Sequence, residues 1–157
     1  MRIAILGAGP GGTWNLNRYP GWECDVQLAL YSFSFEIKPD WSKPYGTQPE
    51  ILAYMRGVAE KYGLMPHVRP GDGVRRAVWD DRSASRTLTL DSGAQQVADV
   101  VVSAIGMFND LAWPEVEGLD RFWGTQFHSA QWPFSVADFQ GRTATVDPAA
   151  FELGLRR

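Results

Sequence analysis

The sequence has very little cysteine, and this limits the chemistry that it can support. Cys24 is the only cysteine among 157 residues. An intrachain disulfide is therefore excluded, and cysteines cannot cluster around a metal ion. We predict no metal site, and we interpret Cys24 as a small packing residue.

Long apolar runs and runs of basic residues are also missing. The longest apolar stretch, residues 100–108, is interrupted by Ser103 and is shorter than the ~18 residues of a membrane span. The N-terminus lacks the apolar length of a signal peptide. The 15 lysines and arginines are scattered and the formal net charge is -3, so there is no electrostatic footprint for nucleic acid or an acidic membrane. We expect a soluble cytoplasmic protein that binds neither.

Glycine is plentiful near the N-terminus, where it follows a short apolar stretch. Residues 3–6 read as a buried strand that runs into Gly7, Gly9 and Gly12. This spacing alone is a weak signal for a dinucleotide site, which also needs a helix that opens at the last glycine. Residues 13–21 contain a Tyr-Pro-Gly turn and no apolar helical period, so we predict a loop there. The acidic residue that holds a ribose hydroxyl about 20 positions on has no counterpart.

Regular structure is predicted in the middle of the chain. A helix over residues 49–62 is capped by Thr47 and carries an apolar face with a period near 3.6, made of Ile51, Met55, Val58 and Tyr62. Strands over 74–79, 86–90 and 97–104 form an antiparallel meander, with residues 91–93 as a tight connection. The uniformly apolar residues 99–104 predict a return to a buried central sheet.

Aromatic residues crowd residues 28–45 without a clear period. Two interpretations stay open for this segment: a loop wrapped over the core, or a wall that faces a ligand. Residues 141–157 show no convincing periodicity.

The most specific pattern in the chain lies at residues 122–133. Its fixed positions are Phe122, Gly124, His128, Trp132 and Pro133, spaced as Phe-x-Gly-x-x-x-His-x-x-x-Trp-Pro. A second pattern, at residues 12–25, combines Gly-Thr-Trp, then Tyr-Pro-Gly, then an aspartate. We call these the C-terminal motif and the N-terminal motif. Together they resemble the type I Baeyer–Villiger monooxygenases, and the resemblance covers residues 3–133.

The resemblance implies a fold class and a domain division. We expect an α/β fold: a partial Rossmann-like FAD-binding domain with an antiparallel β-meander, lacking the first βαβ helix and the second strand. Residues 1–133 would form this partial domain, with one face of its parallel sheet covered by the 49–62 helix. Residues 134–157 would be a truncated linker or tail. The family's NADPH domain is absent, since no second glycine loop follows the C-terminal motif.

The family also implies cofactors and the residues that hold them. The cofactors are FAD and NADPH, and the other reactants are a ketone and O2. Carried across by position, Gly7, Gly9 and Gly12 lie near the FAD pyrophosphate. The residues expected to line the flavin are Thr13, Trp14, Asn15, Leu16 and Tyr31. Val74 is expected to contact the adenine side of FAD through its backbone.

Asp25 is the residue that the resemblance favours for active-site chemistry. Its family counterpart sits beside the flavin and nicotinamide, where a carboxylate can orient a cationic partner of the oxygenated flavin. Without the motif, an Asx-type turn or helix cap would be preferred for Asp25. His128 is of a residue type that often serves as a catalytic base, but we interpret it as a conformational residue that holds two domains in register.

The family chemistry inserts one oxygen atom of O2 next to a ketone carbonyl. Such enzymes need several domains, and 157 residues suffice for one. We therefore expect an incomplete copy that is catalytically incompetent by itself. Two alternatives stay open: a flavin-containing N- or S-oxygenating monooxygenase, and a non-catalytic truncated nucleotide-binding or interaction module. The substrate and the oligomeric state are not specified by the sequence.

Overall fold

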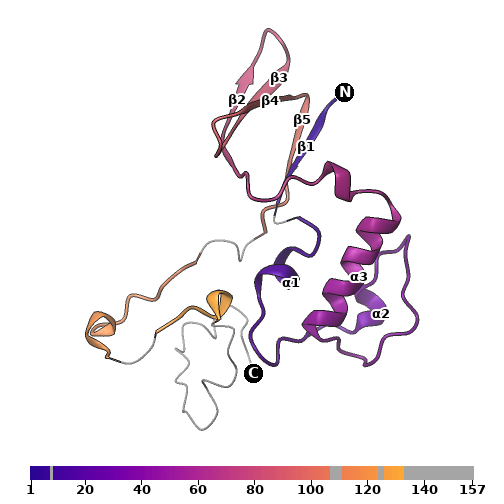
Figure 1. Cartoon of the computed structure of the whole chain (residues 1–157), viewed down its shortest axis with the longest axis vertical. Coiled ribbons are helices and arrows are strands. Elements are labelled where there is room, and N and C mark those ends of the chain that lie inside the picture. The colour runs from indigo at the N-terminus through magenta and orange to yellow at the C-terminus, as the bar shows by residue number, and fades with distance from the viewer. Residues whose placement is uncertain (8, 107–110, 124–125, 133–157) are drawn as a thin grey trace.

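The computed structural model of the chain describes residues 1–7, 9–106, 111–123 and 126–132 (Figure 1). It is a mixed α/β structure, as predicted. The strands are β1 Ile3–Leu6, β2 Val74–Asp80, β3 Ser85–Leu90, β4 Gln95–Ala98 and β5 Val100–Ser103. The helices are α1 Gly12–Leu16, α2 Leu28–Tyr31 and α3 Gln48–Lys61, with 3-10 turns at Met65–His67, Leu119–Arg121 and Ser129–Gln131. Among the described helices, none is long and apolar enough to cross a membrane.

The described strands form two separate sheets. β1 and β5 pair in parallel, from Ile3 opposite Val100 to Leu6 opposite Ser103. β2, β3 and β4 form the antiparallel meander that the sequence predicted. The predicted turn at residues 91–93 is confirmed, because the backbone N–H of Gly93 donates to the carbonyl of Leu90 at 3.0 Å.

The single strand predicted over residues 97–104 is wrong, because the chain changes sheets at Asp99. The carboxylate of Asp99 accepts hydrogen bonds from the backbone N–H and the guanidinium of Arg2, at 2.6 and 3.0 Å. The backbone N–H groups of Asp99 and Val100 both donate to the carbonyl of Arg2. These bonds end β4 at Ala98 and start β5 beside β1.

The expected burial of the parallel sheet is also wrong. Ile5 is 69% exposed and Val102 is 43% exposed. The reason is the position of α3, which packs against α1 and lies away from the β1–β5 pair in Figure 1. The apolar strands are therefore not covered by the helix that we expected over them.

The loop predicted over residues 13–21 is wrong for its first residues, which form α1. The backbone N–H of Trp14 donates to Gly11 at 2.8 Å, and that of Asn17 donates to Thr13 at 2.9 Å. The side-chain amide of Asn17 also donates to the carbonyl and the hydroxyl of Thr13 at 3.1 Å. Trp14 and Asn17, which are both buried, thus stabilise a helical turn. The sequence of this turn has no apolar helical period from which the helix could be predicted.

Helix α3 confirms the predicted helix within one residue at each end. Thr47 occupies the N-cap position, although its side chain makes no capping bond. Two predicted core residues, Ile51 and Val58, are buried. The core cluster that α3 joins consists of Trp14, Cys24, Leu28, Ile51 and Leu52. The packing role predicted for Cys24 is confirmed.

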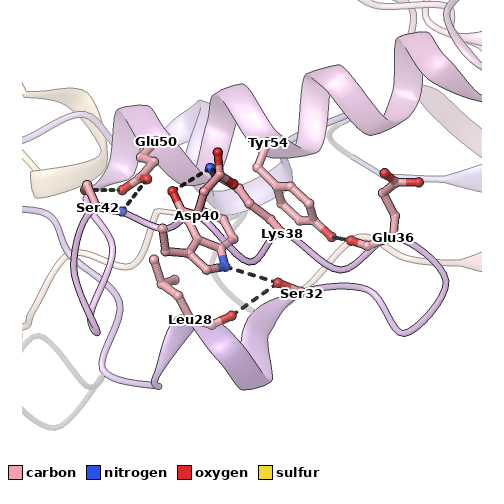
Figure 2. Close-up of polar contacts among 9 residues, drawn as sticks. Leu28, Ser32, Glu36, Lys38, Asp40, Ser42, Glu50 and Tyr54 are labelled. Atoms are coloured by element: carbon pink, nitrogen blue, oxygen red, sulfur yellow. Dashed lines mark hydrogen bonds and ion pairs between the residues drawn. The ribbon is translucent and has the colours of Figure 1, made fainter.

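Residues 32–47 lie along α3 and are fixed to it by polar contacts (Figure 2). Ser42 donates its backbone N–H and its hydroxyl to the Glu50 carboxylate, at 3.0 and 2.7 Å. The Tyr54 hydroxyl donates to the carbonyl of Glu36 at 2.7 Å and accepts from the backbone N–H of Phe33 at 2.8 Å. The interpretation as a loop laid over the core describes residues 32–47, whereas residues 28–31 form α2.

Candidate cofactor-binding site

The glycine loop lies where the two parallel strands end. β1 and β5 run in the same direction, so the loop after Leu6 and the residue Ala104 share one edge of the sheet. A Cβ atom on Gly7 would stand 2.7 Å from the carbonyl oxygen of Ala104, which only glycine permits. Nucleotides bind at this carboxyl edge in open parallel sheets.

Three glycines of the loop adopt positive φ angles: 71° at Gly9, 109° at Gly11 and 44° at Gly12. Their roles differ. A Cβ atom on Gly11 would overlap the side chain of Leu52 in α3, whereas one on Gly12 would meet nothing within 4 Å. Gly11 is thus the packing glycine. Gly12 donates its backbone N–H to the carbonyl of Gly9 at 3.1 Å and leaves open the space that a Cβ atom would fill, through which a phosphate group can approach the loop. The sequence pattern did not single out Gly11.

Trp14 brings two predicted flavin-lining residues together. Its buried indole N–H donates to the Tyr31 hydroxyl at 2.9 Å, and the two rings meet edge to face at 5.9 Å. The side-chain amide of Gln48, at the start of α3, donates to the carbonyl of Trp14. α2 and α3 therefore both hold Trp14, α2 through its indole and α3 through its backbone carbonyl.

An aromatic chain connects the N-terminal motif to the C-terminal motif. The ring of Trp22 lies 5.2 Å from Trp14 and 4.9 Å from Tyr19, and the ring of Tyr19 lies 6.3 Å from Trp132. Burial raises the pKa of Tyr19 to about 12, so this phenol stays neutral among its aromatic neighbours. Two patterns about 100 residues apart in sequence thus meet in space.

The remaining flavin-lining candidates lie on α1. The hydroxyl of Thr13 accepts from Asn17, and the amide oxygen of Asn15 accepts from Arg18 and Arg56. Leu16 is exposed. Val74 lies apart from this group, in the other sheet, where it pairs with Leu90.

Asp25 stands on a bend before α2, with an exposed side chain. Within the described part of the chain, its carboxylate makes no hydrogen bond or ion pair, and the N-cap of α2 is Gln27. The helix-cap alternative for Asp25 is therefore not what the structure shows. Burial raises the pKa of the neighbouring Cys24 thiol, and the charge of Asp25 adds to that rise.

The C-terminal motif is described at three of its five fixed positions, since Gly124 and Pro133 lie outside the described residues. His128 is the N-cap of a 3-10 turn, and its Nδ1 accepts from the backbone N–H of Ala130 at 3.1 Å. Its ring meets Trp113 edge to face at 5.9 Å. Phe122 is exposed. Over residues 1–132, leaving out the gaps in the description, no group of three or more His, Cys, Asp or Glu could hold a metal ion.

Comparison with known proteins gives relatives for most of the chain. No family model matches. A Baeyer–Villiger monooxygenase of Pseudomonas aeruginosa is 40% identical over 139 residues, which cover 88% of this chain and 26% of the relative. An FAD-binding monooxygenase of Aspergillus niger is 37% identical over 154 residues, 92% of this chain and 25% of the relative. A phenazine N-monooxygenase of Lysobacter antibioticus is 34% identical over 141 residues, which cover 87% of this chain and 26% of the relative.

Solved structures agree with these relatives. The open crystal structure of cyclohexanone monooxygenase superposes with a TM-score of 0.76 at 32% identity, over 84% of this chain and 32% of that chain. An oxidized steroid monooxygenase bound to NADP gives a TM-score of 0.72 at 34% identity, over 85% of this chain and 31% of that chain. The chain thus spans about a quarter of the curated relatives' length. The resemblance that the two motifs predicted is confirmed.

Proposed function

Because this chain is homologous over most of its length to a segment of the Baeyer–Villiger monooxygenases, we propose that it is the flavin-contacting part of an FAD- and NADPH-dependent monooxygenase. That enzyme inserts one oxygen atom of O2 next to a ketone carbonyl. The observation that carries the proposal is the contact between the two family motifs, through Tyr19 and Trp132. Residues 1–133 then form a partial Rossmann-like FAD-binding domain and residues 134–157 a linker or tail.

The glycine loop supports FAD binding. Gly7, Gly9 and Gly12 stand at the carboxyl edge of the parallel strands, and the space beside Gly12 is open. Phosphate groups are held by backbone N–H groups in such places. When bound, FAD supplies the hydride-accepting and oxygen-activating chemistry. The acidic ribose ligand has no counterpart, so we assign affinity mainly to the loop and the aromatic residues.

The residues of α1 and α2 supply the wall that a flavin ring requires. Trp14 is fixed by its bond to Tyr31 and by burial, so a planar ring that stacks beside this pair meets a surface that does not rearrange. We assign flavin contact to Thr13, Asn15 and Leu16 on the same turn, and adenine-side contact to Val74.

We assign to Asp25 the orientation of a cationic group near the reacting atoms. Its side chain is exposed and its carboxylate makes no bond to the described residues, so it is accessible to a cationic group that is not among them. A carboxylate placed in this way would hold that cationic group next to the bound FAD, which would supply the oxygen-activating chemistry. We assign to His128 a conformational role, since its ring caps a turn next to Trp113.

We further propose that the chain binds FAD without turning over a ketone by itself. The chain spans about a quarter of the length of the relatives that it matches. An N-oxygenating monooxygenase is the second candidate, favoured by the similarity to the phenazine N-monooxygenase. Both candidates use the same cofactors and differ in the atom that receives oxygen.

A chimera separates the two candidates. The aligned 139 residues of the Pseudomonas aeruginosa relative are replaced by the matching residues of this chain, and the unmodified relative is the control. Incubation with NADPH, O2 and either cyclohexanone or a tertiary amine is followed by mass spectrometry of the products. We expect the lactone. An FAD-loaded chimera that forms the amine oxide and leaves the ketone unchanged would contradict the Baeyer–Villiger assignment.

A further inference from the structure

Three aromatic rings of the N-terminal motif are in contact along a line that leads out of the core. Trp14 is 4% exposed, and its ring centroid lies 5.2 Å from that of Trp22. The ring centroid of Trp22 lies 4.9 Å from that of Tyr19, a residue that is only partly buried. Ring packing accounts for such contacts, but all three rings also belong to tryptophan or tyrosine, the aromatic side chains that give up a single electron most readily.

The indole N–H groups of both tryptophans are kept away from any base. The N–H of Trp14 donates to the neutral hydroxyl of Tyr31 at 2.9 Å. Among the residues that the structure describes, the Nε1 of Trp22 is buried and has no hydrogen-bond partner. A buried N–H without a partner is costly, so packing alone does not explain it. An oxidised indole that loses this proton becomes a weaker oxidant, whereas one that keeps it can take an electron from the next ring.

We propose that Trp14, Trp22 and Tyr19 form a radical relay, which carries a one-electron oxidation from the buried Trp14 to Tyr19. A one-electron oxidant beside Trp14 takes one electron, and the indole becomes a radical cation. Trp22 then gives an electron to Trp14, and Tyr19 gives an electron to Trp22, so both indoles are restored. In this last step Tyr19 releases its phenol proton to water and becomes a neutral radical. A reductant in solution such as ascorbate supplies one electron and one proton and restores the phenol.

The position of Tyr19 suits the end of such a relay. Burial raises the pKa of Tyr19 to about 12 because it disfavours the charged phenolate. The tyrosine radical is neutral, so it does not carry this penalty, and the partly exposed residue can be reached by water and by a small reductant. The use of the relay rests on the proposed function, since one-electron oxidants arise where O2 is activated, and the relay leads them away from the buried indole. The relay itself requires no flavin.

A photo-oxidant attached near Trp14 tests the relay in the flavin-free full chain. Leu16, an exposed residue at the end of α1, is replaced by Leu16→Cys in a Cys24→Ala background and labelled with a ruthenium tris-bipyridine complex. The label is oxidised by a light flash with an external electron acceptor, and transient absorption distinguishes tryptophan radicals from tyrosine radicals. We expect a tryptophan radical that decays as a tyrosine radical appears. The tyrosine radical should form more slowly in D2O, because its formation releases a proton.

Variants of the labelled chain assign the radicals to this path. Trp22→Phe keeps a ring in place and removes no hydrogen bond, and we expect it to abolish the tyrosine radical. With Tyr19→Phe the tryptophan radical should persist. Trp79→Phe, which removes a tryptophan from β2, is the control and should change neither radical.

Three results would overturn the proposal: no tyrosine radical in the labelled chain, a tyrosine radical that survives Tyr19→Phe, or equal yields with Trp22→Phe and Trp79→Phe. The first of these measurements decides even if a variant fails to fold. Titration of the unlabelled chain with FAD tests the proposed function separately, so a failure of FAD binding and a failure of the relay are distinguishable.

Discussion

Gly11 and Gly12 are neighbours in the loop after β1, but their surroundings impose different demands. Both have positive φ angles, yet only Gly11 lies against another side chain, that of Leu52. The pattern Gly-x-Gly-x-x-Gly draws attention to Gly12 and passes over Gly11. The difference in packing exists only once α3 is in place, so it could not be predicted from the spacing.

Replacing Gly11 with alanine tests its packing role. We expect Gly11→Ala to lower the free energy of unfolding by about 2 to 4 kcal/mol, since it combines left-handed strain with overlap in the core. Gly57→Ala is the matched control. Gly57 lies inside α3 with nothing within 4 Å of a Cβ atom, and alanine is expected to stabilise that helix by about 0.5 to 1 kcal/mol. Urea unfolding measures both, and equal effects would refute the assignment.

Tyr19 makes the free energy of unfolding depend on pH in the alkaline range. Burial raises its pKa from 10.0 to about 12 in the folded state, so the folded chain holds this proton more tightly than the unfolded chain. The resulting stability is complete below about pH 10 and is lost as the pH rises toward about 12. We expect the urea midpoint to fall over this range in the wild type and less steeply in Tyr19→Phe. Tyr45→Phe, which removes an exposed tyrosine, should follow the wild type.

At the scale of elements, the segment that covers α3 depends on Tyr54. Its hydroxyl donates to the carbonyl of Glu36 (Figure 2) and accepts from the backbone N–H of Phe33, so Tyr54→Phe leaves both backbone groups without that partner. We expect a loss of about 1 to 2 kcal/mol in the free energy of unfolding. Hydrogen exchange of the Phe33 amide should speed up. Unchanged exchange would show that the segment is held by other contacts.

The elements that follow from local pattern were predicted well. The 3.6-residue period after Thr47 specified α3, and alternation plus a turn at residues 91–93 specified the meander. The missed elements depend on distant partners. α1 forms because Trp14 is buried between α2 and α3, and β5 separates from β4 because Arg2 binds Asp99, which is 97 residues away. Neither partner is visible in a local window.

The candidate site shows the same division. The family resemblance predicted flavin contact for Trp14 and Tyr31, and the structure joins these two residues by a hydrogen bond. The resemblance also predicted adenine-side contact for Val74, which lies in the other sheet. No pattern indicated Gln48 as a support of Trp14 or Arg56 as a partner of Asn15, because both contacts cross between helices.

The molecule as a whole exposes apolar surface on its parallel sheet. Ile3, Ile5, Val100 and Val102 are all exposed, and such surfaces and open strand edges promote association. We expect the purified chain to self-associate as its concentration rises, and Ile5→Lys to reduce this at little cost in stability. Leu30→Lys, which adds the same charge at an exposed position on α2, is the control. Light scattering after size exclusion measures the mass, and a wild-type monomer at all concentrations would contradict the expectation.

The central claim is that this chain holds FAD at its glycine loop, and a titration of the purified chain with FAD tests it most directly. Quenching of tryptophan fluorescence is the readout, with Gly12→Ala and Gly93→Ala as a pair. Both glycines have positive φ angles and open space around a Cβ atom, so both variants carry similar strain. Only Gly12 lies in the loop. We predict saturable binding by the wild type and by Gly93→Ala, weakened about tenfold in Gly12→Ala, because a Cβ atom there occupies the space through which a phosphate group approaches the loop. No saturable binding, or equal affinity of the two variants, would contradict the claim.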